Sequence, residues 1–167
     1  MKINLKNLKK NHTHLVEFEF QTTGREELLA STGGVFAEPI NTHLTVENTG
    51  ELLVGHGTIK TTLQMPCSRC LKEISWPIRA EFDFSIKNPW LNRHLDEDEA
   101  IIFCSPDTVD IRSGVEEAIV MAIPLAPVCS SKCQGLCPIC GKNRNEAACQ
   151  CKDQEIDPRW EKLQNFR

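Results

Sequence analysis

Six of the nine cysteines fall within the 23 residues from Cys129 to Cys151. Their spacing is CxxxCxxxCPICG, followed by seven residues and then CQC. Thiols at this density, with Pro138 and Gly141 shaping a tight turn, are typical of metal ligands rather than of core packing or scattered disulfides. Because so short a segment can bury little apolar surface of its own, we expect a bound metal ion to decide whether it is ordered.

The CPICG turn supplies two thiolates, Cys137 and Cys140, from one knuckle in which backbone N–H groups can face the sulfurs. Cys149 and Cys151 follow after an eight-residue loop and can close a four-thiolate site. Zinc takes four such ligands in a tetrahedron, and a structural site uses all four positions. We therefore expect one zinc ion in a ribbon-like site here. Iron is the alternative metal, although the CPxCG knuckle favours zinc.

Two cysteine pairs are left over, Cys67 with Cys70 and Cys129 with Cys133. If the upstream CSRC motif meets CSSKC across the fold, these four thiols form a second metal site and fix the C-terminal segment onto the body. Two alternatives stay open. Cys129 or Cys133 can replace a later cysteine in a single site, or Cys67 and Cys70 can remain a reduced or redox-active pair.

Residues 14–104 alternate between apolar and polar side chains, which predicts strands with one buried face in an antiparallel sheet. The longest series runs from Ile74 to Ile86 and is interrupted on its opposite face by Pro77, which indicates an edge strand or a bulge. The CSRC motif lies within this run of strands. The Gly55-His56-Gly57 triplet predicts a turn, with His56 as a loop residue.

A helix should begin at Ser113, because Ser113 and Glu116 fit a capping box. Its apolar face would consist of Val115, Ile119, Ala122 and Ile123. Asp157-Pro158 predicts the start of a closing helix over residues 159–166.

The expected fold is therefore α+β: an antiparallel β-rich body with one or two helices and a C-terminal zinc-ribbon-like module. We expect residues 1–128 to form the body, which ends in a helix. Residues 129–167 would form the cysteine-rich zinc-binding module with its closing helix, docked on the body.

The net charge of −4 argues against a protein that coats nucleic acid nonspecifically. The charge is uneven, since residues 95–128 hold eight acidic side chains and a single basic one, Arg112. This distribution fits either an acidic flank that contacts a basic protein or an ordinary solvated surface. No apolar run approaches the ~18 residues of a membrane span. No apolar h-region or small-residue cleavage site follows the basic N-terminus, and we expect a cytoplasmic protein.

The chain resembles the YceD family of bacteria and plastids at four motifs: CSRCL (67–71), GLCPICG (135–141), CQC (149–151) and DPRWEKL (157–163). The resemblance implies a role in the accumulation of large-subunit ribosomal RNA, and so in assembly of the large ribosomal subunit. Arg144 departs from similar tails, which carry an apolar residue before Asn145 and Glu146. This departure concerns the packing of the knuckle loop rather than its ligands.

We expect a non-enzymatic zinc-binding factor for large-subunit ribosomal RNA accumulation, with a pre-ribosomal large-subunit particle as partner. The direct contact would be ribosomal RNA or a basic ribosomal protein, with no membrane and no small-molecule substrate. Basic residues near the knuckle suit phosphate contacts: Lys132, Lys142, Arg144 and Lys152. The alternative is a redox-switched zinc-thiolate protein of chaperone type, whose sulfurs release zinc on oxidation. An enzyme is disfavoured, because an all-thiolate site has no open coordination position.

Overall fold

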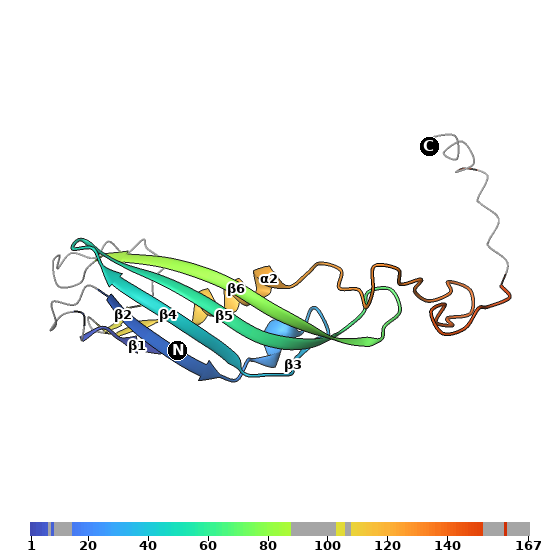
Figure 1. The fold of residues 1–167 in the computed structure, drawn as a ribbon, viewed down its shortest axis with the longest axis horizontal. Helices are drawn as coiled ribbons and strands as arrows, with labels where there is room; N and C mark the ends of the chain where they lie inside the picture. The colour runs from blue at the N-terminus through green and yellow to red at the C-terminus, as the bar shows by residue number, and fades with distance from the viewer. Residues whose placement is uncertain (7, 9–14, 88–102, 106–107, 152–158, 160–167) are drawn as a thin grey trace.

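The computed structural model describes residues 1–6, 8, 15–87, 103–105, 108–151 and 159 (Figure 1). The elements, in chain order, are β1 (Lys2–Asn4), β2 (Leu15–Thr22), the 3-10 helix η1 (Glu26–Leu29), β3 (Val35–Phe36), β4 (Ile40–Asn48), β5 (Leu52–Pro66), β6 (Glu73–Lys87), β7 (Phe103–Ser105), β8 (Thr108–Asp110) and α2 (Arg112–Ala122). The expected α+β, antiparallel β-rich fold is confirmed.

The main sheet is built on a long hairpin of β5 and β6, which pair from Leu52↔Lys87 to Pro66↔Glu73. On the other side of β5, β4 and then β3 pair with successive parts of the strand, and β2 pairs with β4. A second sheet has the order β1-β8-β7. Among the described strands β6 pairs only with β5, so Pro77 lies in an edge strand, as expected.

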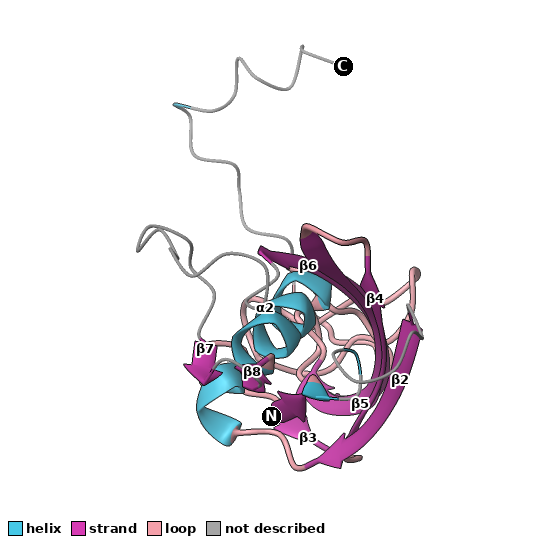
Figure 2. Ribbon diagram, turned by 90° about the vertical axis from the view of Figure 1, so that its left-hand side faces the viewer, coloured by secondary structure: helices cyan, strands magenta, loops and turns pink. Residues whose placement is uncertain are grey.

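The expected alternation of burial is present in the main sheet. Along β4 the buried residues alternate with more exposed ones, and β6 follows the same period at Ile78, Phe82 and Ile86. The sheet curves around α2, which lies on its inner face (Figure 2). Val115 and Ile119 of α2 are fully buried there, as predicted. Among the described residues, the main core is therefore enclosed by the main sheet, α2 and the second sheet, which contributes Ile3 and Val109.

Helix α2 does not begin with the expected capping box. It starts at Arg112, so Ser113 lies within the first turn, and no side-chain cap bond is made at Ile111. The backbone N–H of Arg112 instead donates to the Asp110 carboxylate at 3.0 Å. Glu116 is engaged elsewhere, because it forms an ion pair with Arg25.

His56 lies in the middle of β5 and not in a loop, so the expected turn at Gly55-His56-Gly57 is wrong. The two glycines face inward beneath aromatic rings of β6. A Cβ at Gly55 would lie 2.2 Å from the Phe84 ring, and one at Gly57 would lie 2.1 Å from the Phe82 ring. Glycine is therefore needed at these two positions because of the space that the rings occupy, and not because the chain turns there.

The expected closing helix over residues 159–166 lies outside the described residues, apart from Arg159, and so does the acidic stretch 96–99. The division into residues 1–128 and 129–167 stays a prediction. Of the helices in the described part of the chain, none is long and apolar enough to cross a membrane.

Candidate metal centres

The CSRC motif forms the turn between β5 and β6. The sequence pattern had placed it within a strand, and that prediction is wrong. The backbone N–H of Cys67 donates to the carbonyl of Lys72 at 2.8 Å, and that of Leu71 donates to the carbonyl of Cys67 at 2.9 Å. Leu71 has a φ of 61°, a left-handed conformation that is uncommon for a residue with a side chain. The turn is therefore a tight knuckle.

The CPICG motif forms a second knuckle with the same backbone bonds. Here Cys137 N–H donates to the carbonyl of Lys142 at 2.8 Å, and Gly141 N–H donates to the carbonyl of Cys137 at 2.9 Å. Gly141 has a φ of 72°, so it occupies the position that Leu71 holds in the first knuckle. The chain thus builds the same thiol-presenting turn twice.

The segment after α2 lies against the first knuckle and adds two more cysteines to it. Ser68 N–H donates to the carbonyl of Pro127 at 2.8 Å, and Leu136 N–H donates to the carbonyl of Arg69 at 3.0 Å. The Arg69 guanidinium also donates to the carbonyl of Cys133 at 3.0 Å. These bonds hold residues 127–136 to the end of the β5–β6 hairpin.

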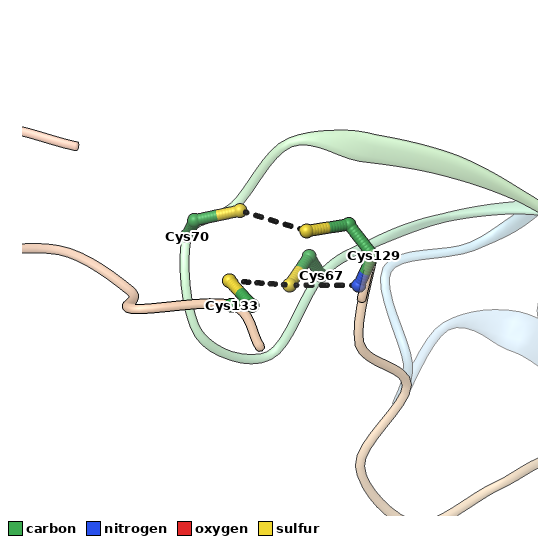
Figure 3. Close-up of side chains that lie close together, drawn as sticks. All are labelled: Cys67, Cys70, Cys129 and Cys133. Carbon is green, nitrogen blue, oxygen red and sulfur yellow. Dashed lines mark hydrogen bonds between the residues drawn. The ribbon is translucent and has the colours of Figure 1, made fainter. Parts of the chain in front are cut away.

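The resulting hairpin cluster consists of Cys67, Cys70, Cys129 and Cys133, whose sulfurs all lie within 4.8 Å of one another (Figure 3). The Cys67 and Cys133 sulfurs are 3.9 Å apart, and the Cys70 and Cys129 sulfurs are 3.7 Å apart. Zinc bonds thiolates at about 2.3 Å, so the sulfurs of a tetrahedral site lie about 3.8 Å apart. The donor set therefore fits a zinc ion. Three of its members are buried and Cys129 is exposed.

The tail cluster consists of Cys137, Cys140, Cys149 and Cys151, and its sulfurs also lie within 4.8 Å of one another. Cys137 is buried and Cys140 is exposed, while Cys149 and Cys151 are half-buried. Each of the two clusters could therefore hold a metal ion, and the tail cluster is the more open to solvent.

Backbone N–H groups aimed at the sulfurs favour the thiolate in the hairpin cluster. Burial of the Cys67 thiol raises its pKa, but the N–H groups of Cys129, Arg69 and Cys70 outweigh burial, and the pKa falls to about 6. At Cys129, hydrogen bonds with the sulfurs of Cys133 and Cys70, together with burial, raise the pKa to about 12. A metal ion would remove this competition for protons, because it binds all four thiolates.

The tail cluster shows the same effect at its first cysteine. The N–H groups of Cys140 and Ile139 lower the pKa of Cys137 to about 6, although burial opposes them. Arg144 also contributes, since its guanidinium lies 3.9 Å from the Cys137 sulfur. The pKa of Arg144 is raised, chiefly by this hydrogen bond. The polar residue at this position therefore supports the knuckle thiolate.

A loop of the tail cluster reaches back to the hairpin cluster through Asn145. The side-chain N–H of Asn145 donates to the Cys133 sulfur at 3.4 Å, and its side-chain oxygen accepts from Gln134 N–H at 2.8 Å. Arg144 N–H donates to the carbonyl of Gly135 at 2.9 Å. No pattern in the sequence indicated this role for Asn145, because the contact depends on how the loop folds.

The structure brings together the same two sets of four cysteines that the sequence indicated. Neither alternative grouping is present, since Cys129 and Cys133 join the upstream pair and Cys67 and Cys70 do not stand alone. Metal ligation by these residues stays a prediction. Lys132 and Lys142 are exposed, whereas Lys152 and the side chain of Cys104 lie outside what the structure describes.

A family model described as "Large ribosomal RNA subunit accumulation protein YceD" matches residues 55–167. An uncharacterized protein of Mycobacterium leprae is 29% identical over 126 residues, which cover 75% of this chain and 58% of that protein. The uncharacterized protein YlbN of Bacillus subtilis is 32% identical over 112 residues, which cover 65% of this chain and 63% of YlbN. The matches thus span less than two thirds of these relatives.

A plant protein is similar over a shorter stretch. The Arabidopsis thaliana protein named "Large ribosomal RNA subunit accumulation protein YCED homolog 1, chloroplastic" is 32% identical over 59 residues, which cover 35% of this chain and 18% of the plant protein. No solved structure matches the chain.

Proposed function

We propose that this chain, which belongs to the YceD family, is a non-enzymatic zinc-binding factor for assembly of the large ribosomal subunit. Membership of that family implies a role in large ribosomal RNA subunit accumulation. In this role the protein acts in the cytoplasm on a pre-ribosomal large-subunit particle. Zinc at the two cysteine clusters shapes the surface that makes the contact.

The observation that carries the metal part of this proposal is the convergence of eight thiols in two sets of four. Four thiolates fill a tetrahedral zinc site and leave no position for water or substrate, which is the arrangement of a structural site. Such a site orders the chain around it and supplies on the order of 10 kcal/mol to folding. That chemistry supports a structural role rather than a catalytic one.

The knuckles also place basic groups where a ribosomal particle could be contacted. Each knuckle ends in an exposed lysine, Lys72 in one and Lys142 in the other. Backbone and side-chain contacts to phosphate position a protein on RNA without reading its sequence. The metal-ordered turns therefore suit contact with an RNA backbone, while the acidic body suits a basic protein.

Depletion of the protein in its own cells tests this proposal. The ratio of large to small ribosomal subunits would be measured on sucrose gradients after complementation with wild type, Cys137→Ser or Cys104→Ser. We expect a selective loss of large subunits that wild type and Cys104→Ser restore and Cys137→Ser does not. Cys104 is the matched control, because it is the one cysteine that belongs to neither cluster. An unchanged subunit ratio on depletion would overturn the proposal.

The exposure of the tail cluster favours one alternative, a redox-switched zinc-thiolate protein. Cys140 is exposed, and Cys149 and Cys151 are half-buried, so peroxide can reach these sulfurs. Hydrogen peroxide would take two electrons from two thiolates and, with two protons, become two waters while one disulfide forms. A chromogenic zinc dye would report the release. Rapid release of zinc in dilute peroxide favours the switch, and retention of zinc supports a structural role.

A further inference from the structure

A groove lies between the edge strand β6 and helix α2. It has a volume of about 510 Å³. Its lining comes from four consecutive residues of β6 and five residues of α2, namely Ala80, Glu81, Phe82, Asp83, Gly114, Glu117, Ala118, Met121 and Ala122. This surface is separate from both cysteine clusters.

The lining shows that the groove runs along the edge of β6 that pairs with none of the described strands. Successive residues of a strand point to opposite faces of the sheet. Ala80 and Phe82 belong to the inner face, whereas Glu81 and Asp83 are exposed on the outer face. A single groove can contact both faces only where it passes the edge of the strand. No described strand pairs with this edge, so its backbone groups can pair with an added strand.

The two sides of the groove have different chemistry. Toward α2 the surface is apolar, with Phe82 beneath, Ala118 beside it and Met121 80% exposed. The charged side chains of the lining are all acidic, namely Glu81, Asp83 and Glu117. Three basic groups lie nearby: His56 is hydrogen-bonded to Asp83, and Arg79 lies opposite Lys60 beside Glu81. The lining of the groove itself contains three carboxylates and no basic side chain.

We propose that this groove binds an extended, basic segment of a partner protein, which adds a strand to the edge of β6. The backbone of the segment would pair with β6, as in other cases of strand addition. Its inward side chains would be apolar and would contact Met121 and Ala118. Its outward side chains would be lysine or arginine beside Glu81 and Asp83. This inference rests on the proposed function for its biological partner, a basic protein of the large-subunit particle.

Charge and backbone geometry both favour a peptide over RNA at this surface. Acidic side chains at the rim repel phosphates, whereas they attract a basic chain and speed its association. A free strand edge offers a row of donors and acceptors with the spacing of another strand, and a nucleic acid backbone does not match that row. The basic knuckles, and not this groove, are the surfaces suited to phosphate.

The test uses the zinc-loaded full chain and a fluorescent 12-residue peptide of alternating lysine and valine. Fluorescence anisotropy would compare it with a peptide of alternating glutamate and valine. We expect the lysine peptide to bind, to weaken as salt is added, and to lose at least about tenfold in affinity in the double variant Glu81→Lys, Glu117→Lys. The matched control is Glu19→Lys, Glu47→Lys, which makes the same charge change on exposed residues of β2 and β4.

Amide hydrogen exchange distinguishes strand addition from loose attraction. Bound peptide should slow exchange at residues 79–84 of β6, and it should not do so in the Glu81→Lys, Glu117→Lys variant. Equal binding of the two peptides, an equal loss in the control variant, or unchanged exchange in β6 would overturn the proposal. So would a dimer of the free protein that the double variant dissociates, because the edge would then belong to a second copy.

The peptide-binding experiment and the depletion experiment can succeed or fail independently of each other. Peptide binding with an unchanged subunit ratio on depletion would leave the groove assigned and the ribosomal role rejected. A selective loss of large subunits without peptide binding would do the reverse.

Discussion

At the scale of single residues, Asn145 is the side chain that joins the two clusters. It belongs to the loop between the two cysteine pairs of the tail cluster, yet its amide donates to the Cys133 sulfur of the hairpin cluster. Its oxygen accepts from Gln134 N–H, and its amide also donates to the Asn143 side chain. Groups that hydrogen-bond to metal ligands orient them and tune their affinity.

The substitution Asn145→Asp should therefore weaken zinc binding at the hairpin cluster. Aspartate keeps the oxygen that accepts from Gln134 but removes the N–H that donates to Cys133. It also places a negative charge beside a thiolate. We expect a loss of about tenfold to a hundredfold in zinc affinity, measured by competition with a chelating dye. The exposed Asn41→Asp of β4 is the control, and an unchanged affinity in Asn145→Asp would show that the contact does not support the cluster.

His56 gives a pH-dependent prediction that is independent of the metal. Its ring nitrogen bonds to the Asp83 carboxylate, and this hydrogen bond, together with the charge of Asp83, raises the pKa of His56 above 6.5. The pair stabilises the fold fully below the unfolded pKa, and this contribution is lost as pH rises through the higher folded pKa. An NMR titration should place the His56 pKa above 6.5, and Asp83→Asn should lower it. A pKa of 6.5 or less in the wild type would contradict this.

At the scale of elements, the two knuckles make the same turn with different residues at the left-handed position. Leu71 holds it in the β5–β6 turn and Gly141 in the CPICG turn, with φ of 61° and 72°. Gly135 has a similar φ of 73°, but it lies against the first knuckle. A Cβ on Gly135 would lie 2.9 Å from the Arg69 carbonyl oxygen, whereas one on Gly141 would meet nothing within 4 Å.

Substitution of these two glycines by alanine should therefore have unequal effects. Gly141→Ala should cost about 1 kcal/mol of unfolding free energy through backbone strain alone. Gly135→Ala should cost more, because the added Cβ also pushes Arg69 away and weakens the Leu136–Arg69 hydrogen bond. Denaturant unfolding of the zinc-loaded protein would measure both. Leu71→Gly is the companion variant, and it should change stability by less than about 1 kcal/mol, since relief of strain offsets the freedom gained by the unfolded chain. The reverse ranking of the two alanine variants would contradict the geometry.

Elements with a single buried face could be predicted from the sequence. The alternation from Ile74 to Ile86 indicated β6, and the spacing of Val115 and Ile119 indicated the inner face of α2. Both patterns are local, because they follow the period of one element. The incorrect predictions concern residues whose role depends on residues far away in the sequence. Gly55 and Gly57 resemble turn residues until the rings from β6 are placed over them.

The cysteine grouping was predictable for a different reason. Once CPICG and CQC form one set, the two leftover pairs are suited to each other, although the sequence left two other groupings open. A count of thiols does not show how the segment after α2 comes to lie against the β5–β6 turn. The bonds from Ser68 to Pro127 and from Leu136 to Arg69 place the pairs side by side. No spacing in the sequence encodes those backbone contacts.

At the scale of the whole molecule, the sheet and the cysteine-rich segment differ in how much apolar surface they bury. The two sheets and α2 enclose a large apolar core, which contains Ile59, Val109 and Ile119. Around the hairpin cluster the buried apolar set is much smaller, and it consists of Cys67, Cys70 and Cys133 with Ile74, Val128 and Leu136 packed against them. In Figure 1 this cysteine-rich part extends beyond the end of the sheet, away from α2. The proposed metal ions would supply there the stabilisation that apolar burial supplies in the body.

Removal of zinc should consequently unfold one end of the molecule and leave the other folded. With a strong chelator, amides of residues 127–151 should exchange rapidly, while those of β4 and the paired part of β5 keep their protection.

The two clusters should differ when each is removed alone. Cys70→Ser should free residues 127–151 together, because the hairpin cluster joins this segment to the body. Cys140→Ser should free mainly residues 137–151, since the intact hairpin cluster, together with the bonds of Ser68 and Arg69, still holds residues 127–136. Equal exchange profiles in the two variants would show that the clusters fold as one unit, and full protection after chelation would show that the segment does not depend on metal.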